Sequence, residues 1–195
     1  MRAFVAACFV LLCASSAATV AAKLDSLLVY GEGFVFSVKE PTGWEGDTEH
    51  ASTYQANMLV YRESSTWQQP DSLVRIRISD KVDEHVENDL AADMDGYKKD
   101  FTNVQFKNFS TPHPIYRTCS KLIFVPGQFY EYVAYVNPGP SSALMFSVAM
   151  NKHSGEATNE ELLAFHNVIS SLVMLKAPQP GAPEGRSAGK PATRP

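Results

Sequence analysis

Two arginines on one expected strand are the residues of this chain best suited to bind a ligand. Arg75 and Arg77 alternate with apolar residues over 74–78, so their guanidinium groups point to the same side of a half-buried strand. Arg62 follows another apolar run, on what we expect to be a neighbouring strand. Guanidinium groups pair with carboxylates and phosphates, so Arg62, Arg75 and Arg77 form a candidate anion-binding site. The alternative is a cross-strand ion pair between Glu131 and one of these arginines, beside a helix.

A second candidate site is the polar loop that carries Trp67. The loop reads Ser-Ser-Thr-Trp-Gln-Gln-Pro over residues 64–70. An exposed tryptophan among polar residues is typical of a recognition surface. Trp67, Gln68 and Gln69 are therefore candidate partner-binding residues. The alternative is a Trp67 side chain that folds back onto the core.

Cys119 is the candidate nucleophile. Arg117 is close enough in sequence to lower the pKa of its thiol, and His113 lies six residues before it. A lone cysteine on an apolar strand is more often a small core residue, however, and the chain has no Gly-x-Ser-x-Gly motif. A thiol-dependent hydrolase is therefore among the functions that we expect least.

The acidic stretch 80–89 is the candidate metal site. His85 and Asp89 are one helical turn apart and could share a cation. Calcium requires six or more oxygens that converge from a loop, which a straight helix does not provide. We expect a solvated acidic helix face, no bound metal and no cofactor, so a metal-dependent hydrolase is equally unexpected.

Two amphipathic helices are expected to position these residues. Over residues 83–101 the apolar positions are spaced 4, 4, 3 and 4 residues apart and form one stripe. Acidic residues come early in this segment and lysines late, as the helix dipole favours. A second helix begins at Thr158, where Glu161 three residues later completes a capping box, and we expect it to end at Lys176.

Strands account for most of the remaining chain. Pro126-Gly127 and residues 137–140 are turn sequences that predict an antiparallel meander. Each helix needs a sheet face to cover its stripe, so we expect an α+β domain with one mostly antiparallel β-sheet flanked by two main helices. The expected order is four strands, a helix, four strands and a helix. The strands that we can place cover residues 34–38, 58–61, 74–79, 104–109, 118–125, 129–136 and 143–150.

The two ends of the chain differ from this domain. Residues 1–22 combine a positive start, a short apolar run and small residues, which is the pattern of a secretory signal peptide. No segment is long and apolar enough to predict a membrane span. Residues 176–195 have no aromatic or branched aliphatic side chain, which predicts a disordered tail rich in Pro, Gly and Ala. Residues 23–175 are left as a single domain, exported to the periplasm or the medium.

The charge of this domain excludes two classes of partner. Residues 23–175 carry 12 Lys and Arg against 20 Asp and Glu, a net charge of −8. Such a domain repels nucleic acid and anionic membrane surfaces. The whole chain is 45% hydrophobic with a net charge of −4, which excludes a protein that is disordered throughout.

Four stretches also carry a family resemblance. They are Gly33–Trp44, which contains F-S-V-x-x-P-x-G-W, Asp89–Phe101 with the strand after it, Gln128–Tyr135, and Phe165–Leu175. Together they resemble the PsbP-like fold superfamily, whose secreted bacterial members include DcrB-like envelope proteins. The resemblance implies a β-sheet flanked by helices, in an α/β/α sandwich, and an accessory or partner-binding role.

These observations favour an exported, non-catalytic accessory protein of the cell envelope. We expect it to bind a protein partner through the loop near Trp67 and the acidic helix. The alternative is a periplasmic module that binds a small molecule or anion, with the arginines in contact with its charged group.

Overall fold

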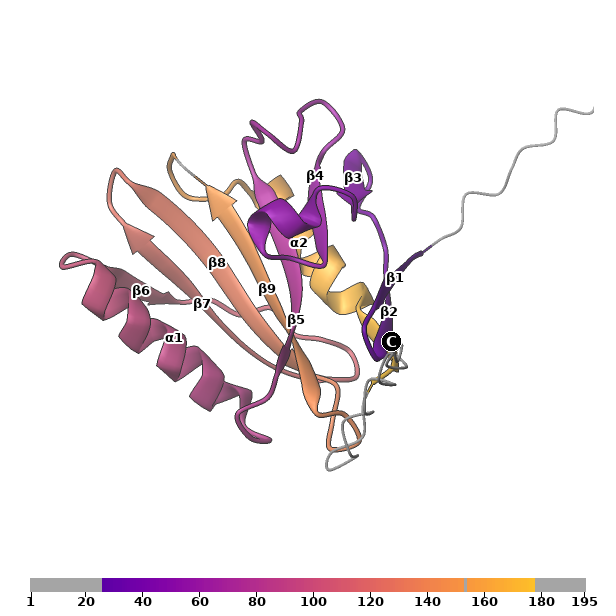
Figure 1. Cartoon of the computed structure of the whole chain (residues 1–195). Coiled ribbons are helices and arrows are strands. Elements are labelled where there is room, and N and C mark those ends of the chain that lie inside the picture. The colour runs from indigo at the N-terminus through magenta and orange to yellow at the C-terminus, as the bar shows by residue number, and fades with distance from the viewer. Residues whose placement is uncertain (1–25, 153, 178–195) are drawn as a thin grey trace, which may run out of the picture.

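The computed structural model describes residues 26–152 and 154–177 (Figure 1). This part of the chain contains ten strands, two α-helices and one short 3-10 helix. In chain order they are β1 (Leu27–Gly31), β2 (Phe34–Val38), β3 (Trp44–Asp47), η1 (Ala51–Tyr54), β4 (Met58–Arg62), β5 (Leu73–Asp80), α1 (Val86–Asp100), β6 (Gln105–Asn108), β7 (Arg117–Val125), β8 (Phe129–Asn137), β9 (Leu144–Lys152), α2 (Asn159–Ser171) and β10 (Val173–Lys176).

The strands form two antiparallel sheets, where one had been expected. The larger sheet has seven strands in the order β3-β4-β5-β9-β8-β7-β6, and the smaller has the order β1-β2-β10. The second sheet exists because β1, which was not predicted, folds back on β2 through a turn in which Gly33 has a φ of 80°. The α+β class with mostly antiparallel pairing is confirmed.

The predicted meander forms three adjacent inner strands of the larger sheet. β7, β8 and β9 pair in sequence, and β9 continues onto β5. Gly127 and Gly139 lie in the two turns with φ values of 76° and 106°, a conformation that other residues rarely adopt. The turn sequences therefore fix where each strand of the meander ends.

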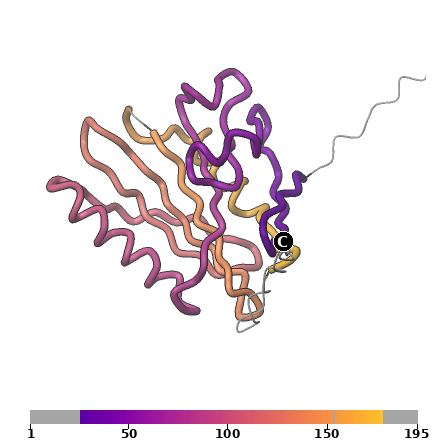
Figure 2. Tube along the Cα trace, in the orientation of Figure 1, coloured from indigo at the N-terminus to yellow at the C-terminus, as the bar shows by residue number. Residues whose placement is uncertain are grey.

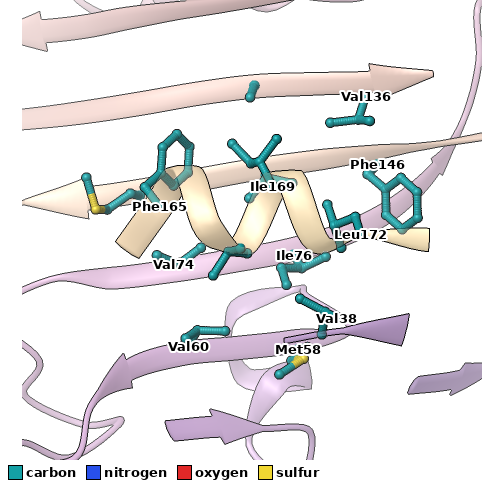
Figure 3. Close-up of a cluster of buried hydrophobic side chains, with 14 of the residues drawn as sticks. Val38, Met58, Val60, Val74, Ile76, Val136, Phe146, Phe165, Ile169 and Leu172 are labelled. Atoms are coloured by element: carbon teal, nitrogen blue, oxygen red, sulfur yellow. The ribbon is translucent and has the colours of Figure 1, made fainter. Parts of the chain in front are cut away.

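α2 and the smaller sheet cover one face of the larger sheet. The capping box is present, since the Thr158 side chain accepts from the Glu161 backbone and Glu161 accepts from the Thr158 backbone. Phe165 and Ile169 of α2, and Leu172 directly after it, are fully buried and point toward the sheet (Figure 3). They meet an apolar cluster that includes Val38, Met58, Val60, Val74, Ile76, Val136 and Phe146.

α1 covers the opposite face of the larger sheet (Figure 1). Its predicted stripe is confirmed, because Val86 and Leu90 are buried against side chains of β7, β8 and β9. The acidic residues are not all solvated as expected. Asp89 is 7% exposed and accepts a hydrogen bond from the Val82 amide, 3.3 Å away.

The last helix is shorter than predicted. α2 ends at Ser171, Leu172 adopts an extended conformation, and Val173–Lys176 forms β10 on the free edge of β2. Pairing with β2 satisfies the backbone groups of both segments, and this tertiary gain outweighs the helical pattern of the sequence. Lys176 therefore belongs to a strand and not to the expected tail.

The expected signal peptide and most of the expected tail are not among the residues that the structure describes. The expected signal peptide, residues 1–22, and residues 178–195 of the expected tail are outside the described residues. Over the described ranges, neither helix combines the length and the apolar character that crossing a membrane requires.

Candidate functional site

A groove lies on the α1 side of the larger sheet. α1 covers β7 and β8, while η1 and the chain after it cover β4, on either side of β5 and β9 (Figure 2). Between them are two adjoining hollows, with volumes of about 200 Å³ and about 520 Å³, which share Tyr54 and Arg75. We refer to the two together as the groove. Its first hollow is lined by residues that include Gln55, Arg77, Asp93, Tyr97 and Glu131, and its second by residues that include Gln68, Gln69, Pro70, Leu73 and Asn151.

Arg75 forms an ion pair in this groove. Its Nη2 lies 2.6 Å from Oε1 of Glu131, whose side chain is 5% exposed. The structure thus shows the ion-pair alternative for Arg75. The Nε atom of Arg75 is buried and has no hydrogen-bond partner among the described residues. The Nη2 of Arg75 is therefore used within the protein, and its Nε remains a donor without a partner in the described structure.

Two tyrosine hydroxyls form hydrogen bonds between α1 and β8, one donated from each element. The Tyr97 hydroxyl of α1 donates to Glu131 of β8, and the Tyr135 hydroxyl of β8 donates to Asp93 of α1. Burial and the neighbouring carboxylate raise the pKa of each phenol, although Arg77 acts in the opposite direction on Tyr135. Both hydroxyls therefore stay protonated and continue to donate at neutral pH.

Arg77 is the free cation of the groove. It lies two residues beyond Arg75 on β5, in register with the small Ser147 of β9. Its side chain is exposed. No ion pair within the described residues includes it. Its positive charge is therefore available to a ligand.

Arg62 does not join the other two arginines. Leu59 of β4 is in register with Arg75, so alternation along β4 places Arg62 on the opposite face of the sheet. There its Nη1 lies 2.7 Å from Oε1 of Glu160 in α2, and its guanidinium lies 5.4 Å from the centre of the Trp44 ring. The expected three-arginine cluster is thus a pair on one face and a single arginine on the other.

Trp67 folds back onto the protein. Its ring stacks on His50 with the centroids 4.3 Å apart, and its carbonyl accepts from the Tyr54 hydroxyl at 2.9 Å. Gln68 and Gln69 are exposed and line the second hollow. The three partner-binding candidates therefore differ in position. Trp67 packs against the protein and supports the loop, whereas Gln68 and Gln69 lie at the groove.

Sequence reasoning did not identify Tyr54, Gln55, Asp93 or Tyr97 as groove residues. Gln55 has a φ of 53°, and among the described residues it is the non-glycine with a left-handed backbone. A conformation of this kind is often found at binding sites, but it cannot be read from the sequence. Asp93 and Tyr97 had a usable signal, because they are four residues apart on one face of the predicted helix.

Cys119 lacks the surroundings of a nucleophile. Its Sγ donates to the Val86 carbonyl at 3.1 Å, and burial, followed by Glu87 and Asp89, raises the pKa of the thiol to about 12. His113 is engaged elsewhere, with Nε2 2.9 Å from the Leu172 carbonyl oxygen. The thiol is therefore protonated at neutral pH and has no base beside it.

The acidic stretch 80–89 forms hydrogen bonds within itself. The Asp83 carboxylate accepts from the His85 amide and from the Asn88 side chain. Across residues 26–152 and 154–177, no group of three or more His, Cys, Asp or Glu side chains is placed to bind a metal ion.

Comparison with known proteins finds no matching family model and no matching curated protein. Among solved structures, this chain is similar to the solution structure of cyanobacterial PsbP (CyanoP) from Synechocystis sp. PCC 6803, with a TM-score of 0.45 and 13% sequence identity. The match covers 78% of this chain and 95% of the other. The similarity concerns the fold alone and transfers no function to this chain.

Proposed function

We propose that this chain is an exported, non-catalytic binding protein of the cell envelope that binds an anionic group of its ligand in the groove. The observation that carries the proposal is Arg77, an exposed arginine that lines the first hollow and has no ion-pair partner in the described structure. Export rests on the pattern of residues 1–22, and an accessory role rests on the family resemblance.

The charges around Arg77 favour a ligand that brings a single carboxylate or phosphate group to it. Arg75 and Glu131 neutralise each other, and one oxygen of Asp93 is occupied by the Tyr135 hydroxyl. Asp93 still offsets part of the field of Arg77. A free anion alone therefore binds weakly, and a ligand of useful affinity needs further contacts along the groove.

The geometry gives no support to a catalytic role. Catalysis by a nucleophile needs an activated group beside a base. The phenols that line or adjoin the groove, Tyr97 and Tyr135, have raised pKa values through burial and act as hydrogen-bond donors. Binding is the function that these groups fit.

A protein partner is our first candidate for the ligand. Gln68 and Gln69 are exposed at the mouth of the second hollow, where amide groups can pair with the backbone of another chain. A free small molecule is the second candidate. It is favoured by the hollow of about 520 Å³, which is within the size range of small-molecule sites.

An amide NMR titration with sodium acetate and with inorganic phosphate, at constant ionic strength, tests the anion site. We expect shifts centred on Arg77, Ser147 and Gln55, and their loss in Arg77→Gln. Arg117→Gln is the matched control, because Arg117 is an exposed arginine of the same sheet that lies outside the groove. Absence of shifts, or equal shifts in Arg77→Gln, would contradict the proposal.

A further inference from the structure

We infer that the ligand of the groove is an extended peptide segment with one carboxylate at the Arg77 end and an apolar side chain at the Leu73 end. The inference rests on the proposed function, since it requires that Arg77 binds an anion. It adds the class of the ligand, its direction along the groove and the residues that contact its backbone.

The direction of the groove follows β5. Leu73 and Arg75 line the second hollow, and Arg75 and Arg77 line the first. From Leu73 to Arg77 a strand advances roughly 13 Å, at about 3.3 Å per residue. An extended peptide of about four residues has the same length.

Two unpaired polar atoms lie along this path. The Nε of Arg75 is a donor and the Oδ1 of Asn151 is an acceptor, and both are buried without a hydrogen-bond partner in the described structure. They come from adjacent strands, because Asn151 is in register with Leu73, two residues before Arg75. A donor and an acceptor on adjacent strands are complementary to the carbonyl and amide of a peptide backbone. A simple anion pairs with the donor only.

Both atoms are turned away from solvent in this structure. A buried polar group without a partner is unfavourable, so a rotation of either side chain toward a ligand is favoured once a partner is there. Asn151 and Arg75 each line the second hollow, and the inference requires that their side chains turn toward the ligand when it binds. The peptide supplies these two hydrogen bonds in addition to the ion pair with Arg77.

The Leu73 end of the groove is suited to an apolar side chain. Leu73 and Pro70 line it, together with Tyr54, whose hydroxyl is fixed by the Trp67 carbonyl. The exposed amides of Gln68 and Gln69 lie beside this end and can pair with the backbone as it enters. The peptide has one acidic group because residues 23–175 carry a net charge of −8, which opposes a polyacidic ligand.

The test uses the purified protein and synthetic tetrapeptides that consist of leucine, two alanines and a final residue. The first probe ends in aspartate with an amidated terminus, the second in asparagine with an amidated terminus, and the third in alanine with a free terminal carboxylate. Sodium acetate and sodium hexanoate are the comparison anions. Dissociation constants come from amide NMR titrations.

We expect the aspartate probe or the free-carboxylate probe to bind at least about tenfold more tightly than acetate, and the asparagine probe to lose that gain. Which of the two probes binds tells whether the carboxylate comes from a side chain or a chain terminus. Arg77→Gln is expected to abolish the difference between aspartate and asparagine. Asn151→Leu should weaken the peptide and leave acetate unchanged, and Gln68→Ala with Gln69→Ala gives a second test on exposed residues.

Two results would overturn the inference and leave the anion site intact. One is a peptide that binds no more tightly than acetate, and the other is hexanoate that binds as tightly as the best peptide, which would identify an amphiphilic small molecule. If neither acetate nor any peptide shifts the groove residues, the proposed function fails as well. Arg117→Gln must bind every probe as the wild type does.

Discussion

The Nη2 of Arg75 lies 2.6 Å from the Oε1 of Glu131, although β9 runs between the two strands that carry them. The pair is diagonal, because Glu131 is in register with Asn151 and, through it, with Leu73. Only long side chains can meet above an intervening strand. Ala149, in register with Arg75, is small enough to leave them room.

Loss of Arg75 is expected to destabilise the fold. Arg75→Met leaves the buried Glu131 carboxylate with the Tyr97 hydroxyl as its remaining hydrogen-bond partner in the described structure, which we expect to cost about 2–3 kcal/mol in the free energy of unfolding. Urea unfolding measures this cost. Glu131→Gln in the same chain should recover part of it, because no charge is then left unpaired.

The matched control for this pair is Arg117→Met. Arg117 pairs with Glu87 at 2.8 Å, but both side chains are about half exposed, so we expect a cost below about 0.5 kcal/mol. Equal costs for Arg75→Met and Arg117→Met would show that burial of Glu131 contributes nothing.

Acid should weaken the protein through Glu161. Burial acts to raise its pKa, but hydrogen bonds from Lys152, Ser72 and Thr158 outweigh burial and lower the pKa to about 2. The pKa in the folded state is thus below that in the unfolded state. The resulting stability, about 3 kcal/mol, is present above about pH 5 and is lost as the pH falls toward 2.

Glu161→Gln is expected to flatten this part of the pH profile of unfolding. Glu160→Gln is the control, since Glu160 precedes it in α2 and pairs with Arg62, but its side chain is 68% exposed. Chemical denaturation at a series of pH values compares the two variants. A wild-type slope below pH 5 that survives in Glu161→Gln would assign the acid sensitivity to other carboxylates.

Trp67→Ala should reduce stability by about 2 kcal/mol, because the ring packs on His50 and on the cluster around Leu59 and Leu73. Gln68→Ala should leave stability unchanged, because the side chain is exposed. Thermal unfolding of the two variants separates a supporting residue from a contact residue. A Trp67→Ala protein as stable as wild type would restore Trp67 as a candidate for direct partner contact.

Cys119 is expected to resist thiol reagents in the folded protein. A rise in pKa from 9.0 to about 12 lowers the thiolate fraction at pH 8 by about a thousandfold, before burial limits access further. Alkylation with iodoacetamide in buffer and in urea, followed by peptide mass spectrometry, measures the rate at Cys119. Rapid labelling of the native protein would revive the thiol-enzyme hypothesis.

Patterns that act within one element could be predicted from the sequence. The stripe of α1, the capping box at Thr158 and the turns of the meander each depend on residues close in sequence. The common face of Arg75 and Arg77 also followed from alternation along one strand. Each of these predictions needed no knowledge of how separate elements pair.

Features that depend on register were missed. The face of Arg62 relative to Arg75 is set by the pairing of Leu59 with Arg75, and a shift of one residue would have reversed it. β10 formed because β2 offered a free edge, which the local pattern of residues 173–176 does not reveal. The groove itself depends on Gln55 and on small residues of β9, whose importance appears only in three dimensions.

The reciprocal hydrogen bonds from Tyr97 to Glu131 and from Tyr135 to Asp93 have a consequence for the kinetics of binding. A slide of α1 by one turn along β8 would break both bonds at once. The two bonds therefore hold α1 in one position on the sheet, which sets its separation from β5 before any ligand arrives. The proposed peptide then meets a groove whose backbone walls are already in place, and the rearrangement on binding is confined to side chains such as Arg75 and Asn151 and to the peptide itself. Association should follow simple second-order kinetics, and differences in affinity between peptides should lie in their dissociation rates.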